Sequence, residues 1–318
     1  MRRLFELGLV FICIVIGSSA WAQKTVRLSV ATGGTGGVYY PYGGAIANVI
    51  SKYVPGTDAT AEVTAAAIDN LKLVGAGEAD FGFAYPDISY DAMEGKGLFK
   101  SKLPIRMMTH LYVSYFHLVA LSGSNIKSVA DLKGKRVSTG APGSGTEVVA
   151  IRVLEAYKLN SDKDVKRDRL SVVESAGALK DGKIDAFFWV GGLPTAAILD
   201  LASTPNLSMI LIPHDDCLPK IFEKYGQIYV KAVVPKTTYP KMTSEVGVVG
   251  IPNVLVCNAK AGEDVIYHSL KAMFDHRNDL IAVHSEAKNL TLENAVIKSP
   301  VPYHPGAVKF FKEKGVKM

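Results

Sequence analysis

Two short segments of small residues could bind an anion through their main-chain groups. The first is "TGGTGGVYY" at 32–40 and the second is "APGSGTE" at 141–147, and each precedes a helical pattern. Helix N-termini present unpaired N–H groups and the positive end of the helix dipole, which favour carboxylates and other small anions. The alternative is that both segments are ordinary tight turns with N-caps.

The spacing of these residues does not fit a nucleotide site or a hydrolase. A G-x-G-x-x-G pattern that starts at Gly34 would need glycine where Tyr39 stands, and no G-x-x-x-x-G-K-[ST] motif occurs. A serine-hydrolase elbow around Ser144 would need glycine where Pro142 stands. An exported hydrolase is therefore the weakest hypothesis, and we predict that the protein is not an enzyme.

Metal and acid–base chemistry are equally poorly supported. The seven histidines form no H-E-x-x-H motif, and "HDDC" at 214–217 is the one compact set of possible metal ligands, which we interpret as a polar loop. The carboxylates between Asp80 and Glu94 are typical of exposed helix ends and complete no catalytic set. We predict no metal, no cofactor and no catalytic residue.

The first 22 residues have the pattern of a secretory signal peptide. Two arginines precede an apolar run at 7–16, and Ala20-Trp21-Ala22 supplies an A-x-A cleavage site. The run is shorter than the roughly 20 residues that span a bilayer. We predict cleavage after Ala22. The mature chain is then longer than one hydrophobic core usually accommodates, which predicts two lobes.

Charge and cysteine content give weaker constraints. Lysine and arginine total 36 and aspartate and glutamate 30, for a net charge of +6. Apart from "KDVKRDR" at 163–169 the basic residues are dispersed, which disfavours a nucleic-acid partner and suits small anions. The sequence leaves open whether Cys217 and Cys257 form a disulfide.

The elements that must position the two segments alternate between strands and helices, which is typical of an α/β fold. The expected strands are 25–33, 58–66, 79–85, two strand-like runs within 104–121, 169–175, 185–192 and 207–212. The expected helices are 45–53, 67–78, 148–159, 176–183, 261–280 and 291–297.

The same patterns divide the chain into lobes. We expect lobe 1 to comprise 23–121 and 247–318 and lobe 2 to comprise 122–246, with the second crossover within an irregular stretch at 213–246. Ligands of open α/β sheets bind at the carboxyl ends of the strands. A small anion would then lie between the lobes, with the Ser144 and Thr146 hydroxyls and the glycine amides as donors.

Four segments in this order resemble the TAXI family, the periplasmic solute-binding receptors of tripartite ATP-independent periplasmic (TRAP) transporters. The segments are "GGTGGVYYPYGGAIANVI", "NLKLVGAGEADFGFAYPD", "SVADLKGKRVSTGAPGSGTE" and "YHPGAVKFFKEKG". The resemblance covers nearly all of the mature chain. It implies a type II periplasmic-binding-protein fold with the ligand cleft between the lobes. It also implies a periplasmic receptor that closes on a small organic acid or amino acid and delivers it to TRAP membrane permease subunits. We expect the receptor to be a monomer.

The resemblance also implies ligand-binding residues. Those of lobe 1 are Thr35, Gly36, Gly37, Val38, Tyr39, Asn70, Tyr85 and Asp87. Those of lobe 2 are Ser144, Gly145, Thr146, Trp189, Gly191, Gly192 and Pro194. Phe188 is an alternative to Trp189 as the aromatic wall of lobe 2, and Tyr40 to Tyr39 in lobe 1. His304 matches a family motif, and we expect it to support packing.

The chain departs from the family pattern near the cleft. "YPD" at 85–87 and three alanines at 65–67 replace more polar residues, which favours an organic acid such as a C5 dicarboxylate over a glutamate-like amino acid. No arginine occurs in 181–192, so amides and hydroxyls would hold the anion, with Arg27 and Arg106 as alternatives. An exported ligand sensor or surface antigen of the same fold is the alternative function.

Overall fold

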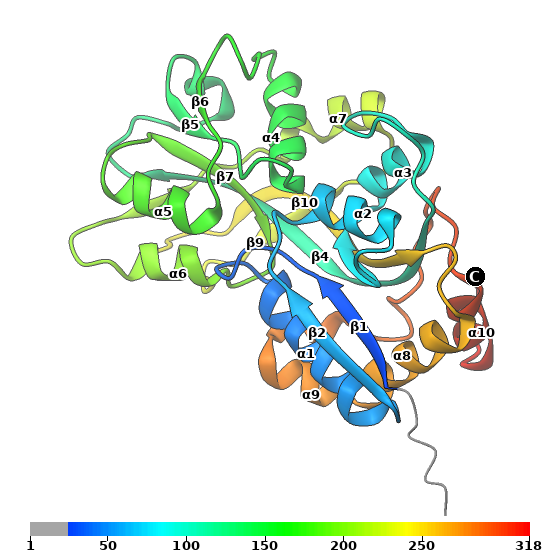
Figure 1. The fold of residues 1–318 in the computed structure, drawn as a ribbon. Helices are drawn as coiled ribbons and strands as arrows, with labels where there is room; N and C mark the ends of the chain where they lie inside the picture. Colours follow the sequence, from blue (N-terminus) through cyan, green and yellow to red (C-terminus); the bar gives the residue numbers. More distant parts are fainter. Residues whose placement is uncertain (1–24) are drawn as a thin grey trace, which may run out of the picture.

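The computed structural model describes residues 25–318 (Figure 1). The predicted signal peptide and its cleavage after Ala22 lie outside these residues and stay predictions. Within residues 25–318, every helix is too short or too polar to cross a membrane.

Ten strands of the described chain form one mixed sheet in the order β2-β1-β3-β10-β4-β7-β5-β6, with β8 paired to β4 and β9 to β10. β1 pairs in parallel with β2 and β3, and β5 with β6 and β7. The strands are β1 Val26–Ala31, β2 Thr57–Glu62, β3 Phe81–Ala84, β4 Ile105–Leu121, β5 Arg136–Ser138, β6 Lys166–Asp168, β7 Ala186–Gly191, β8 Met209–Leu211, β9 Val230–Val234 and β10 Val246–Asn258.

Helices cover the sheet. The α-helices are α1 Tyr39–Tyr53, α2 Ala67–Ala76, α3 Pro86–Glu94, α4 Gly145–Ala156, α5 Val172–Lys180, α6 Ala196–Ser203, α7 Leu218–Tyr225, α8 Glu263–Asp275, α9 Arg277–Val283 and α10 Pro305–Glu313. Short 3₁₀ helices are η1 Val129–Leu132, η2 Asp215–Cys217 and η3 Ser285–Asn289. His304 N-caps α10 by accepting from the N–H of Gly306, which is the expected supporting role.

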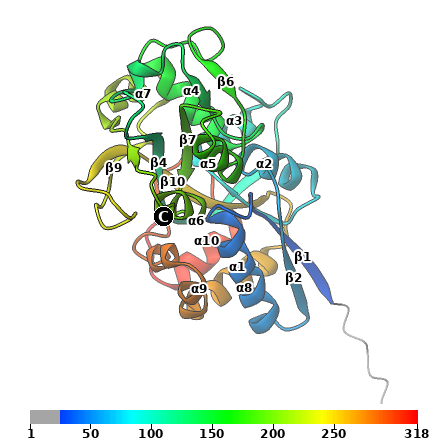
Figure 2. The same ribbon diagram turned by 90° about the vertical axis from the view of Figure 1, so that its left-hand side faces the viewer.

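Two long strands, β4 and β10, connect the two halves of the molecule. The first half contains β1, β2, β3 and α1, and the second contains β5, β6, β7 and α4. β4 pairs with β10 through its first part and with β7 through residues 115–120. In Figures 1 and 2, β1, β2 and α1 lie below these strands, and β6 and α4 lie above them. The predicted α/β, two-lobed type II fold is confirmed. The division of the chain into lobes at 121 and 246 stays a prediction, because β4 and β10 belong to both halves.

Several predicted elements differ from the structure. The two expected runs within 104–121 form the single strand β4, and the stretch at 213–246 contains α7 and β9. No helix forms at 291–297.

The segment at 169–175, expected to be a strand, instead starts α5. Ser171 and Glu174 form a capping box, in which each side chain accepts a hydrogen bond from the other residue's N–H, and this outweighs the β-branched Val172 and Val173. Cys217 and Cys257 are both buried and free.

Candidate ligand-binding site

A cavity of about 330 Å³ lies between the two halves of the molecule. The N-termini of α1, α4 and α5 all contribute to its wall. The lining residues are Gly33, Gly34, Thr35, Gly36, Gly37, Val38, Tyr39, Val63, Thr64, Ala65, Ala66, Tyr85, Tyr112, Ala141, Ser144, Gly145, Thr146, Ser171, Val172, Val173, Glu174, Trp189, Val190 and Gly191.

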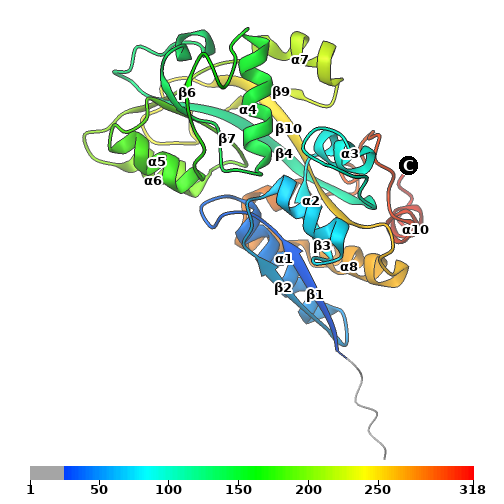
Figure 3. The same ribbon diagram turned by 45° about the horizontal axis from the view of Figure 1, so that its top comes forward.

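The loop between β1 and α1, which we call the first loop (residues 32–38), reaches across to the other half of the molecule (Figures 1 and 3). A Cβ atom on Gly36 would lie 2.3 Å from Cγ2 of Val173 in α5, and one on Gly37 would lie 3.0 Å from the Trp189 ring. None of the glycines at 33, 34, 36 and 37 has a left-handed φ. Glycine is therefore needed in this loop for close approach of the two halves.

The loop before α4, which we call the second loop (residues 141–147), is built as a capped turn. The Ser144 hydroxyl donates to the Ala141 carbonyl at 2.7 Å and accepts from the Glu147 N–H at 3.2 Å. The Thr146 hydroxyl accepts from the Val190 N–H at 3.2 Å, and no acceptor for its own proton occurs among the described residues. Ser144 therefore serves the turn, whereas the Thr146 hydroxyl keeps a proton that no described residue accepts.

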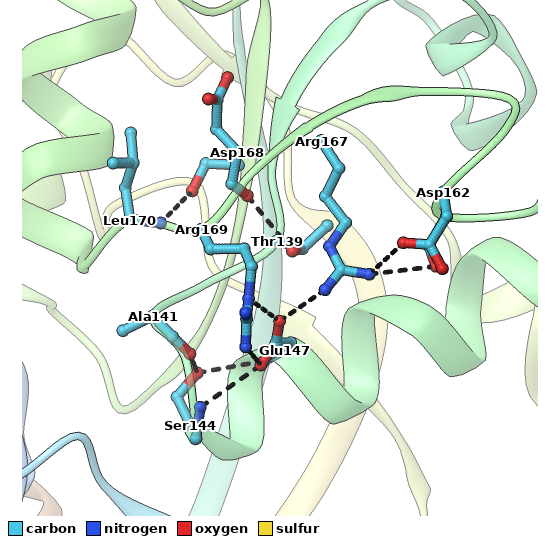
Figure 4. A network of polar contacts seen from close by, with 12 residues as sticks. Thr139, Ala141, Ser144, Glu147, Asp162, Arg167, Asp168, Arg169 and Leu170 are labelled. Carbon is cyan, nitrogen blue, oxygen red and sulfur yellow. Dashed lines mark hydrogen bonds and ion pairs between the residues drawn. The ribbon is translucent and has the colours of Figure 1, made fainter.

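Glu147, in the first turn of α4, lies between two guanidinium groups (Figure 4). Its carboxylate accepts from Arg169 Nε at 2.5 Å and from Arg167 Nη2 at 2.8 Å, and its side chain is only 5% exposed. The hydrogen bond from Arg169 raises the pKa of that guanidinium. Because the two cations offset the carboxylate, the N-terminus of α4 keeps its attraction for an anion.

Aromatic rings close two sides of the cavity. Trp189 lies under the first loop and donates from Nε1 to Thr195 at 3.0 Å. Tyr39 stacks on Phe83 with ring centroids 4.6 Å apart, and its hydroxyl donates to Asn253 at 2.5 Å.

Of the alternatives left open by the sequence, Tyr40 and Phe188 do not line the cavity. Tyr40 is 36% exposed at the surface, and Phe188 is buried in the core.

Four of the sequence-predicted site residues do not line the cavity: Asn70, Asp87, Gly192 and Pro194. Asn70 donates to the carbonyls of Thr32 and Phe83 at 2.7 and 2.9 Å. It therefore joins α2 to β3 and to the end of β1. Gly192 packs against Glu286, and the Leu193–Pro194 bond beside it is cis. Direct ligand contact by these residues has no geometric support, while the roles of the lining residues stay predictions.

Asp87 belongs to a buried ion pair between the two halves. It contacts Arg152 of α4 and accepts from the Tyr229 hydroxyl at 2.7 Å. Arg152 also lies 3.3 Å from Asp91. Burial alone would lower the pKa of Arg152, but Asp87 and Tyr229 raise it above its usual value. Asp87 therefore anchors α4, the helix that carries the second loop.

The sequence did not reveal part of the lining, namely Val63, Thr64, Tyr112, 171–174 and Val190. The Ser171-x-x-Glu174 spacing could have indicated that 171–174 begins a helix, because this spacing is typical of a helix N-terminus.

Ala66 has a φ of +78°, which residues other than glycine rarely adopt. Two residues later, the Ile68 N–H donates to the Gly143 carbonyl at 3.2 Å and joins the two halves beside the cavity.

Glu174 is the one charged residue among the described lining residues, and its carboxylate is bound by Ser171. Arg27 and Arg106, the alternative cations, do not contribute to the wall. Apolar side chains and neutral hydroxyls therefore dominate the wall.

The "HDDC" segment is occupied by structural contacts. His214 is buried and bonds through Nδ1 to the Ile212 carbonyl at 2.9 Å, and burial lowers its pKa to about 4. Asp215 pairs with Lys231 at 2.8 Å. Among residues 25–318, no group of three histidine, cysteine or carboxylate side chains is arranged to hold a metal ion.

Comparison with known proteins identifies the family. The alkanesulfonate-binding protein SsuA from Xanthomonas axonopodis pv. citri, bound to MOPS, is 17% identical, with a TM-score of 0.50 over 92% of this chain and 95% of that one. The periplasmic aliphatic sulphonate binding protein SsuA from Escherichia coli is 15% identical, with a TM-score of 0.48 over 92% and 94%. At this identity the likeness to the first shows a shared fold. Residues 30–315 match the NMT1-like family, and the chain therefore belongs to that family.

Proposed function

We propose that the protein is a periplasmic receptor that closes on a small carboxylate-bearing solute and delivers it to a TRAP membrane permease. The observation that carries this proposal is the convergence of the N-termini of α1, α4 and α5 on one cavity between the two halves. The N–H groups in the first turn of a helix have no intrahelical partner. In such a cavity they would bind an anion without a cationic side chain.

Contacts across the cavity support closure as the binding step. The first loop lies against Val173 and Trp189 of the other half, and Ile68 is hydrogen-bonded to Gly143. A ligand bound between two such surfaces contacts both only when they are together, so it stabilises the closed arrangement. The closed arrangement is then the form that a membrane partner recognises.

The wall chemistry favours an organic acid such as a C5 dicarboxylate over a glutamate-like amino acid. An ammonium group would need acceptors, and the one carboxylate of the described wall, Glu174, already accepts from the N–H of Ser171 at 2.8 Å. The alkanesulfonate-binding protein of the same fold makes a sulfonate a reasonable second anion to test.

A thermal-shift screen followed by calorimetry tests the proposal. The acids are glutarate, 2-oxoglutarate, glutamate, pentanoate and an alkanesulfonate, with pentanamide as the uncharged control. We expect at least one carboxylate to raise the melting temperature, because a ligand that binds only the folded state stabilises it. A response to pentanamide alone, or to none of the acids, would overturn the proposal.

An exported ligand sensor or surface antigen is the competing function. A receptor gene should lie beside a gene for a large multi-span permease, whereas a sensor gene need not. Ligand binding in a chain without such a neighbouring gene would favour the sensor.

A further inference from the structure

A tyrosine hydroxyl in the cavity wall has no hydrogen-bond partner. Tyr112 lies in β4, is 0% exposed and lines the cavity, and no described residue pairs with its hydroxyl. Buried hydroxyls are nearly always paired, because leaving one unpaired costs its full desolvation. Unlike Tyr42, whose buried hydroxyl is also unpaired, Tyr112 lines the cavity, so a ligand is available as its partner.

The polar neighbours of Tyr112 make their hydrogen bonds to other groups. Asn253 accepts from Tyr39 and donates to Ser114 at 2.6 Å, and it also donates to the main-chain carbonyls of Tyr112 and Ile251. Burial raises the pKa of Tyr112 and the neighbouring Ser114 hydroxyl lowers it as a hydrogen-bonding group would, but the two oxygens do not meet hydrogen-bond geometry. Asn253 is therefore engaged with other groups, and the Tyr112 hydroxyl has no partner of suitable geometry among the described residues.

The Tyr112 hydroxyl is a donor at any ordinary pH. Burial raises its pKa well above 10, and the negative field of Glu286 adds to the effect. Glu286 itself accepts from the Leu193 N–H at 2.7 Å and from Asn289 at 2.8 Å. No lysine or arginine of residues 25–318 lines the cavity to offset that field. Because a neutral hydroxyl is the donor here and no described lysine or arginine lines the cavity, a neutral oxygen suits this position better than a second buried carboxylate.

We infer that Tyr112 forms a second subsite of the cavity, which accepts a neutral oxygen of the ligand, such as a ketone, amide or hydroxyl oxygen. The inference rests on the proposed function and narrows it. The ligand then carries one carboxylate for the helix N-termini and one neutral oxygen for Tyr112. Oxo- and hydroxy-monocarboxylates fit this description better than unsubstituted dicarboxylates.

Matched acid pairs test the inference by calorimetry. The pairs are pentanoate with 4-oxopentanoate, hexanoate with 5-oxohexanoate, and heptanoate with 6-oxoheptanoate, and glutarate represents the dicarboxylates. For at least one pair, the oxo acid should bind the wild-type protein about three- to tenfold more tightly, which is the usual net worth of one hydrogen bond. Glutarate should bind more weakly than that oxo acid. This comparison requires no variant.

Two tyrosine variants then locate the effect. Tyr112→Phe should remove the preference for the oxo acid over the matched plain acid. Tyr42→Phe is the matched control, because the Tyr42 hydroxyl is also buried and unpaired but does not line the cavity. Tyr42→Phe should retain the wild-type preference.

The outcomes separate this inference from the proposed function. Binding of carboxylates with no oxo preference in the wild-type protein, or an equal preference in Tyr112→Phe, would overturn the inference and leave the proposed function standing. Tight glutarate binding with no oxo preference would do the same. If none of the acids binds, both the proposed function and the subsite fail.

Discussion

The first and second loops bring helix N-termini to the same cavity by different means. In the first loop, Gly36 and Gly37 lack side chains and so pack closely against Val173 and Trp189 of the opposite half. The second loop is braced within its own half by the Ser144 cap and the Glu147–Arg169 pair. The first loop therefore depends on the opposite half for its packing, whereas the second also has a cap and an ion pair within its own half, besides the Ile68–Gly143 hydrogen bond to the other half. Each prediction below tests one of the two loops or the helix that carries it.

Asp87→Asn should have the largest effect, because it removes the main counter-charge of buried Arg152 on α4. Loss of one partner of a buried ion pair typically costs about 3–5 kcal/mol. Asp91→Asn is the matched control, since the Asp91 side chain is 29% exposed and lies at 3.3 Å from Arg152; we expect about 1 kcal/mol or less. Urea unfolding measures both. Equal losses would mean that Asp87 does not anchor the helix of the second loop.

Gly36→Val should weaken ligand binding by about 3 kcal/mol, or roughly 150-fold, with little change in the melting temperature of the free protein. The added side chain would overlap Val173 and hold the halves apart. Gly44→Val is the control, because a Cβ at Gly44 meets nothing within 4 Å.

A rescue sharpens the interpretation. Gly36→Ala places a Cβ against Cγ2 of Val173, and Val173→Ala removes that atom. The double variant should therefore recover most of the affinity that Gly36→Ala loses. Additive losses would show that Gly36 acts through the shape of its own loop.

Thr146→Val should cost about 1.5–3 kcal/mol of binding free energy, because the hydroxyl that can donate to a charged ligand is lost. Thr146→Ser, which keeps the hydroxyl, should bind nearly as the wild type does. Calorimetry with the tightest acid of the screen measures both. Equal affinities in all three proteins would contradict a role for Thr146 as donor.

Ser144→Ala should mainly reduce stability, by about 1 kcal/mol, because the hydroxyl caps α4. Its proton already goes to Ala141. Thermal melting and calorimetry on the same sample separate the two effects. A loss of affinity as large as that of Thr146→Val would show that Ser144 binds ligand after all.

The two loops also show what sequence can and cannot predict. The strand–loop–helix order around Gly36 and around Ser144 is local, so hydrophobic periodicity and capping residues reveal it. The contacts of Asn70 with Thr32 and of Asp87 with Arg152 could not be predicted, because these partners are distant in sequence. Tyr112 lies in a long apolar run in which no local pattern distinguishes it.

The start of α5 illustrates a different failure. Val172 and Val173 favour a strand by intrinsic propensity, whereas the capping box formed by Ser171 and Glu174 favours a helix. The cap prevails because it satisfies N–H groups that would otherwise be unpaired at a helix N-terminus that lines the cavity. Because the expected helix at 176–183 began four residues after the start of α5, its N-terminus was not recognised as part of the site.

Arg169→Gln should have the smallest effect and examines the electrostatic side of the second loop. Glu147 would keep only Arg167 as a close cation, and its less balanced charge would oppose an anion at the N-terminus of α4. Because the Arg169 side chain is 47% exposed, solvent screening limits the loss to about 0.5–1 kcal/mol of binding free energy. The loss should shrink as salt is added, whereas the Thr146→Val loss should not. A loss independent of salt would mean that Arg169 acts by positioning the loop and not by its charge.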